Sequence, residues 1–280
     1  MPGTCCLVTG ANAGIGRETV AGLAALGARV LMVCRDENRG AAAMDEIRQR
    51  LPGAGLELLI ADLSCLTEVR ALVADVVRRT DRLDVLVSNA GVFSSRRRVT
   101  EDGFELTFGV NHLAPFVLVR GLTELLRRSA PARVVIVASA AHRRGTIDFD
   151  DLQAERRYGG WRVYSQSKLA NVLFARELAD RLPAREVTVN SLHPGVVATK
   201  LLLRGIVPRW LARPFTVTPA EGAKTSIHVA SAPELEGVTG RYFDACRPKE
   251  PSKEAQSKEV AERLWSVSEK LTRTGRDART

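Results

Sequence analysis

Short apolar runs alternate along the chain with longer stretches whose apolar residues recur at helical spacing. Continuous runs rich in Val, Leu and Ile are typical of strands buried on both faces of a parallel sheet. They predict strands at 5–9, 29–34, 56–60, 83–88, 133–137, 187–193 and 240–243. The stretches between them predict helices at 17–26, 37–51, 68–79, 104–128, 154–182, 220–230 and 260–271. This alternation predicts an α/β fold, a doubly wound parallel sheet of about seven strands with helices on both faces.

The chain has the size and composition of one domain. Of its 280 residues, 45% are apolar, which is enough to build a substantial core. The sequence contains no long polar linker and no internal repeat. We therefore expect a single domain over residues 1–280, with residues 246–280 as a C-terminal extension that ends in a polar, basic segment.

The first expected strand leads through a glycine-rich turn into the first expected helix. The turn and the start of the helix contain Gly10, Asn12, Ala13, Gly14, Ile15 and Gly16. Glycine permits positive φ and lets the backbone approach a pyrophosphate, and the free N–H groups of a helix N-terminus favour phosphate. The spacing of the three glycines differs from the common G-x-G-x-x-G form. The order of strand, turn and helix nevertheless indicates a nucleotide site.

The second expected strand ends at Arg35, about 20 residues beyond the glycines, where dinucleotide folds place the group that reads the adenosine ribose. A guanidinium there suits the 2′-phosphate of NADP, and Arg17 would add a second positive contact. The pattern favours NADP(H). NAD(H) stays open, because Arg35 could face solvent while Asp36 binds the ribose. We expect Asp36 instead to cap the helix 37–51.

Tyr164 and Lys168 lie one turn apart in a strongly helix-forming stretch, which places a phenol and an ammonium on one face. Free tyrosine titrates near pKa ~10, and a nearby cation can bring that pKa close to neutrality with roughly 4 kcal/mol of differential stabilisation. Such a pair also occurs on solvated helix faces, so it needs a partner group. Ser139 follows the expected strand 133–137 and would meet Tyr164 at the carboxyl edge of the sheet. There a hydroxyl and a proton donor would stabilise the oxygen of a carbonyl that receives hydride.

Several short motifs follow one another in order along residues 4–245. They are Thr9-Gly10-x-x-x-Gly14-Ile15-Gly16, Asn89-Ala90-Gly91, Asn111, Ser139, Tyr164-x-x-x-Lys168 and Pro194-Gly195. On these motifs the chain resembles the short-chain dehydrogenase/reductase (SDR) family, which implies a Rossmann-type fold. Strings such as Cys34-Arg35-Asp36, Asn111-His112-Leu113 and Ser139-Ala140-Ala141-His142 resemble its retinol dehydrogenase-type branch. One departure is Ala138, where family members often have a first serine.

The resemblance implies roles for individual residues. The catalytic set would be Asn111, Ser139, Tyr164 and Lys168. Tyr164 would be the general acid/base, and Lys168 would lower its pKa and hold the nicotinamide ribose. Ser139 would bond the reacting oxygen, and Asn111 would hold a relay water. Cofactor contacts would come from the glycine turn, Arg17, Arg35, Asp62, Leu63, Asn89, Ala90, Gly91, Tyr164, Lys168, Pro194, Gly195, Val197 and Thr199, the last of these at the carboxamide.

The same resemblance divides the domain by task. Residues 1–100 would mainly bind the cofactor, and residues 101–245 would carry the chemistry. The segment 200–217 is apolar but interrupted by arginines. With residues 246–280 it is expected to form a lid over an apolar substrate, while contact with a membrane surface stays an alternative. The chain has no run of about 18 uncharged apolar residues, so we expect no stable membrane anchor and a cytoplasmic enzyme.

Charge and cysteine usage bear on other functions. The five cysteines lack C-x-x-C spacing and the four histidines show no ligand spacing, so no metal site is expected. The net charge of +9 raises nucleic-acid binding as an alternative, with clusters such as Arg96-Arg97-Arg98. These clusters lie on different expected loops and helix ends without interleaved aromatic residues. We therefore expect no nucleic-acid partner and a surface that steers an anionic cofactor.

Together the patterns predict an NADP(H)-dependent oxidoreductase. It would interconvert a carbonyl and a primary or secondary alcohol on a lipophilic small molecule that resembles a retinoid, a steroid or an aliphatic carbonyl compound. The alternative is a non-catalytic NADP(H)-binding sensor or scaffold protein. The helices at 104–128 and 154–182 resemble those through which family members form homodimers and homotetramers, and the oligomeric state stays open.

Overall fold

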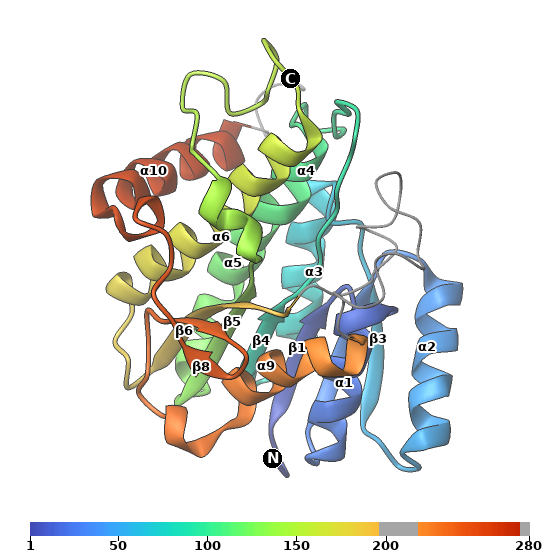
Figure 1. Ribbon diagram of the computed structural model, residues 1–280. Coiled ribbons are helices and arrows are strands. Elements are labelled where there is room, and N and C mark those ends of the chain that lie inside the picture. The colour runs from blue at the N-terminus through green and yellow to red at the C-terminus, as the bar shows by residue number, and fades with distance from the viewer. Residues whose placement is uncertain (196–217, 275–280) are drawn as a thin grey trace.

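An eight-stranded sheet runs through the centre of the molecule in the order β3-β2-β1-β4-β5-β6-β7-β8 (Figure 1). The computed structural model describes residues 1–195 and 218–274. The strands are β1 (Cys5–Thr9), β2 (Arg29–Cys34), β3 (Leu56–Ile60), β4 (Val85–Ser88), β5 (Ala132–Val137), β6 (Val187–His193), β7 (Tyr242–Asp244) and β8 (Arg247–Pro248). Neighbours from β3 to β7 pair in parallel, and β8 pairs antiparallel with β7. The predicted doubly wound parallel sheet is confirmed, with one more strand than expected.

Helices cover both faces of this sheet (Figure 1). They are α1 (Gly14–Ala25), α2 (Glu37–Arg50), α3 (Leu66–Arg79), α4 (Leu106–Phe108), α5 (Ala114–Arg128), α6 (Gly160–Arg181), α9 (Pro219–Ser231) and α10 (Lys258–Thr274). Alternate residues of β1 separate two cores: Cys6 and Val8 pack with α1, α2 and α9, while Leu7 packs with α3, α5 and α6. Burial on both faces explains why the strands read as continuous apolar runs.

The strand order reverses between β1 and β4, so the connections leave these two strands toward opposite faces. The carboxyl ends of β1, β4, β5 and β6 therefore meet at one edge without a helix closing the space between them. The glycine turn follows β1, Asn89 follows β4, and Ser139 follows β5. The topology thus brings the predicted motifs to one end of the sheet.

The helix expected over 104–128 is interrupted. A π-helical turn, Gly109–Leu113, separates α4 from α5. A side chain at Gly109 would place Cβ only 3.2 Å from Thr100 Cγ2, so the missing side chain allows this close approach. Single π turns of this kind are frequent at functional sites, and this one contains Asn111.

The helix expected over 154–182 begins later, at Gly160. Ala154 has φ of 48°, in the left-handed region that a right-handed helix excludes. The Asp151 carboxylate accepts the Glu155 N–H at 2.7 Å, which satisfies this amide outside a helix. Short 3₁₀ turns at Ala140–Arg144, Pro233–Leu235 and Glu254–Gln256 complete the described structure.

The described part of the C-terminal extension packs on the outer side of α5 and α6 (Figure 1). Trp265 of α10 contacts Phe116 of α5, with ring centroids 5.0 Å apart, and stacks on Phe174 of α6 at 5.9 Å. Arg120 of α5 pairs with Glu269 at 2.8 Å. The α10 helix therefore covers part of α5 and α6, which correspond to the two helices that the sequence analysis named as candidates for dimer contacts. The predicted lid segment 200–217 lies outside the described residues.

Candidate active site

Lys168 enters the site from α6 and is almost completely buried, with 3% of its surface exposed. Its Nζ donates to the Val137 carbonyl oxygen at 3.0 Å. Burial lowers the pKa of this ammonium to about 8. An ammonium has three donors, and the bond to Val137 uses one of them, which leaves capacity for a ribose hydroxyl. The role that the resemblance implies for Lys168 at the nicotinamide ribose stays a prediction.

Tyr164 lies one turn before Lys168, whose Nζ is 5.8 Å from the centroid of the phenol ring. Partial burial raises the pKa of Tyr164, and a hydrogen bond with the Ser139 side chain acts in the opposite direction. The Lys168 ammonium does not contribute to this shift of the Tyr164 pKa. The sequence-based expectation of a lowered Tyr164 pKa is therefore not met by the chain alone, because desolvation outweighs the hydrogen bond with Ser139.

Ser139 lies two residues beyond the end of β5 in extended conformation and caps the 3₁₀ turn that follows. Its Oγ accepts the Ala141 N–H at 3.2 Å, so the hydroxyl proton remains available to donate. The Ser139 side chain also lies within hydrogen-bonding reach of the Tyr164 hydroxyl. A carbonyl oxygen placed between them would receive two donors.

Asn111 is fully buried in the π turn. Its Oδ1 accepts the Val92 N–H at 2.7 Å, and its Nδ2 donates to the Val92 carbonyl at 3.0 Å and to Ser167 Oγ at 3.0 Å. Between Asn111 and Lys168 lies Gly91, where an added Cβ would be 3.4 Å from both Oδ1 and Nζ. The amide thus anchors the segment after β4 beside Lys168. The relay water assigned to Asn111 stays a prediction.

The glycine turn has the predicted form. Gly10 and Gly14 have φ of 68° and 56°, and a Cβ on Gly16 would lie 2.2 Å from the Gly10 carbonyl oxygen. Asn89 ties the turn to β4, because its Nδ2 donates to the Thr9 carbonyl at 2.8 Å. The N-cap of α1 is Ala13, and no side chain of the described residues caps this helix end. Its N–H groups are left for an anionic ligand, which fits a dinucleotide pyrophosphate.

Arg35 lies at the carboxyl end of β2, with 69% of its side chain exposed, and its Nη1 is 4.0 Å from Asp62 Oδ2. Arg17, in contrast, pairs with Glu18 and Glu46. Asp36 caps α2 by accepting the Arg39 N–H at 2.9 Å, which confirms the predicted cap. Arg35 is therefore better placed than Arg17 to reach an added phosphate.

Sequence reasoning missed an aromatic cluster beside the phenol. Phe93 lies 5.1 Å from Trp161 and 5.9 Å from Tyr164 between ring centroids, and Trp161 lies 5.8 Å from Tyr164. Trp161 is 44% exposed. The sequence did contain one indication of this cluster, because Trp161 and Tyr164 are three residues apart and therefore lie on the same face of a helix. Pro194 and Gly195 follow β6 at the same edge, while Val197 and Thr199 lie outside the described residues.

A family model described as short chain dehydrogenase matches residues 4–204. The chain belongs to the short-chain dehydrogenase family. Retinol dehydrogenase 14 of Mus musculus is 47% identical over 96% of this chain and 86% of its own length. Retinol dehydrogenase 12 of Homo sapiens is 45% identical over 96% of this chain and 86% of its own length. These relatives confirm the retinol dehydrogenase branch and an NAD(P)-dependent dehydrogenase/reductase.

Solved structures confirm the fold of this short-chain dehydrogenase. An uncharacterized protein from Mycobacterium Paratuberculosis superposes with a TM-score of 0.79 at 32% identity, covering 97% of this chain and 94% of that one. The Pseudomonas aeruginosa RhlG/NADP active-site complex superposes with a TM-score of 0.69 at 28% identity. The match covers 87% of this chain and 94% of that one. Together with the glycine turn and Lys168, these neighbours support a nicotinamide cofactor and a small-molecule substrate for this chain.

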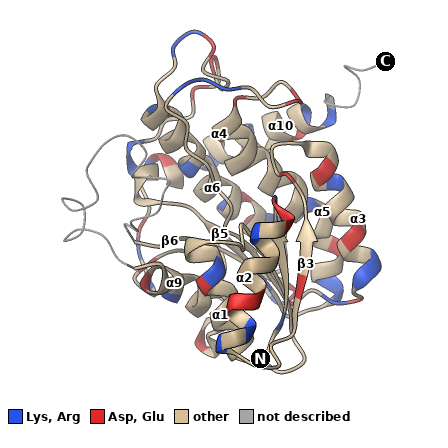
Figure 2. Cartoon of the chain, turned by 90° about the vertical axis from the view of Figure 1, so that its right-hand side faces the viewer, with Lys and Arg blue, Asp and Glu red and all other residues tan. Residues whose placement is uncertain are grey.

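The charged surface of this dehydrogenase is mixed. Figure 2 shows basic and acidic positions interspersed over α1, α2 and α3. Glu18 pairs with Arg50 at 3.2 Å, and Glu57 pairs with Arg29 at 2.7 Å. Within the described ranges, no group of three or more His, Cys, Asp or Glu is arranged to hold a metal ion. Nor does any described helix combine the length and apolar character needed to cross a membrane.

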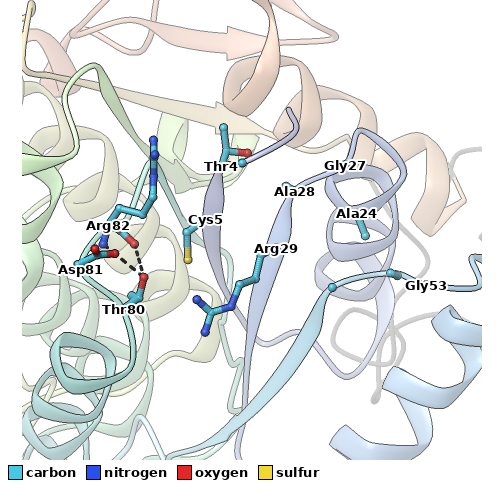
Figure 3. A pocket seen from close by; sticks show the side chains of 13 residues that line it. Thr4, Cys5, Ala24, Gly27, Ala28, Arg29, Gly53, Thr80, Asp81 and Arg82 are labelled. Carbon is cyan, nitrogen blue, oxygen red and sulfur yellow. Dashed lines mark hydrogen bonds between the residues drawn. The ribbon is translucent and has the colours of Figure 1, made fainter.

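A hollow of about 450 Å³ lies at the amino ends of β1 and β2, the opposite end of the sheet from Tyr164 (Figure 3). Arg29 and Arg82 line it, and Cys5 lies between them. Both arginines are ion-paired, Arg29 with Glu57 and Arg82 with Asp84. Since the catalytic groups lie at the carboxyl ends of the strands, this hollow is not the active site.

Proposed function

We propose that the protein interconverts a carbonyl and an alcohol on a lipophilic small molecule, of retinoid, steroid or long aliphatic type, with NADP(H) as its preferred cofactor. The observation that carries the substrate class is the cluster of Phe93 and Trp161 beside Tyr164. An indole left 44% exposed next to the reacting phenol offers apolar surface to a substrate that enters there. The names of the retinol dehydrogenase relatives support the retinoid type.

The chain's own residues supply three functions. Ser139 and Tyr164 donate to the reacting oxygen and stabilise its charge, and Tyr164 delivers or removes its proton. Lys168, held by Val137, binds the ribose side and keeps a positive charge near the phenol. The nicotinamide supplies the hydride when it is bound. Phe93 and Trp161 orient the apolar part of the substrate and exclude water from the same side.

The NADP(H) preference rests on Arg35. Replacing Arg35 by Ala should raise the Kd for NADPH about tenfold and leave the Kd for NADH nearly unchanged, because only NADPH offers a 2′-phosphate to the guanidinium. Direct titration of the purified protein with each nucleotide at moderate salt measures both constants.

The matched control is Arg78→Ala on α3. It removes the same charge from a side chain that is 70% exposed, against 69% for Arg35, far from the cofactor edge. Equal weakening of NADPH by both variants would assign the effect to net charge alone. A wild-type preference for NADH would overturn the NADP(H) proposal.

The lipophilic substrate is tested with aldehydes of increasing length, ending with retinaldehyde. In the wild-type protein the KM should fall as the apolar chain grows. Trp161→Ala should raise the KM for the longest aldehydes about tenfold and leave short ones almost unaffected, because only long substrates reach the indole. Steady-state kinetics with NADPH measures this.

Trp161→Phe should restore much of the lost affinity, and Leu26→Ala, which removes an apolar side chain that is 42% exposed at the end of α1, should have no effect. A KM that is independent of chain length would contradict the lipophilic substrate. Tight NADPH binding without turnover of any carbonyl tested would favour the non-catalytic sensor instead.

A further inference from the structure

The peptide group between Ser139 and Ala140 is held at both of its polar atoms by a histidine. The Ser139 carbonyl oxygen lies 2.7 Å from His142 Nδ1. The N–H of Ala140 donates to His193 Nδ1 at 3.2 Å. Two imidazoles from different segments thus fix the plane of this one peptide group. The peptide group begins at Ser139, whose side chain contacts Tyr164.

The partners determine where each ring carries its proton. A carbonyl oxygen only accepts, so His142 Nδ1 must donate, and His142 Nε2 accepts the Ser252 N–H at 3.2 Å. His193 Nδ1 accepts the Ala140 N–H, so His193 carries its proton on Nε2. Both rings therefore work in the neutral form, with opposite tautomers.

Each ring is fixed by its surroundings. His142 is completely buried, and its ring lies 4.8 Å from that of Tyr242. The strand β6 ends in His193, which is 8% exposed and pairs in register with Asp244 of β7. Ser252 belongs to the segment that leads from β8 to α10, so the C-terminal extension reaches the site through His142.

We propose that His193 and His142 are positioning residues that hold the Ser139–Ala140 peptide, and hence the Ser139 hydroxyl, in its reactive orientation, and that protonation of His193 releases this hold. The proposal rests on the proposed function of the site. Rotation of the peptide would change ψ of Ser139 and remove the bond from the Ala141 N–H to Ser139 Oγ. The hydroxyl would then no longer be aimed at the oxygen that Tyr164 serves.

Burial favours the neutral form of His193 at ordinary pH and outweighs the opposing charge of Asp244. Burial lowers the pKa of His193, Asp244 opposes this and Lys249 adds to it. Lys249 and Asp244 pair with each other at 2.7 Å, which reduces the field of each at the ring. For His142, burial likewise lowers the pKa, with Arg143 and His193 acting in the same direction and the Ser139 carbonyl opposing.

The sign of the pH dependence follows. A histidine whose pKa is depressed on folding binds its proton more readily in the unfolded chain. Its contribution to stability is fully present above its ordinary pKa of 6.5 and is lost as the pH falls through the lower folded value. A protonated His193 has no acceptor at Nδ1 for Ala140. The turnover number should therefore decline in acid with a midpoint below pH 6.5, before global unfolding.

Three substitutions of His193 separate positioning from simple packing. His193→Asn places an amide oxygen near the position of Nδ1 and does not titrate. His193→Gln carries its amide farther out, near the position of Nε2, and His193→Leu removes all polar atoms. We expect kcat to fall about tenfold or more for Leu and Gln and to recover for Asn, with the Kd for NADPH unchanged in all three. The ratio of kcat at pH 5.5 to kcat at pH 7.5 should be nearer to one in His193→Asn than in the wild-type protein.

Equal kcat values for Asn, Gln and Leu variants, or an unchanged pH ratio in the Asn variant, would overturn the proposal. Nitrogen-15 NMR of the histidine rings provides a second measurement that does not depend on turnover. It should show the Nε2–H tautomer for His193 and the Nδ1–H tautomer for His142 in the folded wild-type protein. The reverse tautomer at His193 would refute the hold even if the protein were active. Correct tautomers in a protein that turns over no carbonyl would leave the geometry intact and refute the proposed function.

Discussion

Replacing Tyr164 by Phe should lower kcat about 10²–10⁴-fold, the range that a positioned acid or base contributes, while NADPH binding changes little. The substitution removes one oxygen atom and keeps the ring that contacts Phe93 and Trp161. Ser139 then remains as the only donor of the pair, and the alcohol loses the phenol that would accept its proton. Single-turnover measurements with saturating NADPH separate this loss from product release.

The matched control is Tyr158→Phe. Tyr158 also lies near the site, where its hydroxyl donates to the Ser94 carbonyl at 2.8 Å, and its loss should leave kcat within a small factor of the wild-type value. Because burial raises the pKa of Tyr164, the phenol stays protonated at neutral pH unless a bound cation opposes this. Carbonyl reduction should thus persist through neutral pH, and alcohol oxidation should accelerate as the pH rises. A Tyr164→Phe variant that keeps most of its activity would refute the mechanism.

Much of this fold follows from local patterns, because each strand of a doubly wound sheet is buried on both faces. Every predicted strand appears, since runs such as 30–34 have no charged position that would allow another interpretation. The two-residue strand β8 is too short to create a pattern. The π turn and the left-handed Ala154 depend on contacts with Thr100 and Asp151, and hydrophobic periodicity carries no information about such contacts.

In the site, too, the sequence predicted contacts between residues close in sequence and did not predict contacts between residues far apart. Residues one helical turn apart, such as Tyr164 and Lys168, are related by helix geometry, so their spacing predicted their juxtaposition. The His142 bond to Ser252 joins residues 110 positions apart, and the His193 bond to Ala140 joins residues 53 apart. No local spacing connects these pairs. The sequence pattern assigns no role to His193, and only the fold shows that its Nδ1 reaches the peptide after Ser139.

Replacing Gly16 by Ala should raise the Kd for NADPH about 10–100-fold, equivalent to about 1.4–2.7 kcal/mol, and should also lower the free energy of unfolding by about 1–3 kcal/mol. An added Cβ would lie 2.2 Å from the Gly10 carbonyl oxygen and 2.5 Å from Asn89 Nδ2. The first of these is backbone and cannot turn aside, so the turn must separate from the start of α1. That movement disturbs the bond from Asn89 to the Thr9 carbonyl and displaces the helix N–H groups that face the pyrophosphate.

The Gly16 effect should appear as two changes with one cause, a lower Tm and weaker nucleotide binding, whereas Tyr164→Phe should affect turnover alone. Gly55→Ala is the matched control, because a Cβ there comes no closer than 3.6 Å to Arg29 at the opposite end of the sheet. It should leave nucleotide affinity unchanged. Calorimetric titration with NADPH and thermal unfolding of both variants test this. Normal NADPH affinity in a Gly16→Ala protein would mean that the glycine turn does not form the phosphate cradle. In that case the close approach of Gly16 to Gly10 would serve only the packing of α1 against β1 and β4.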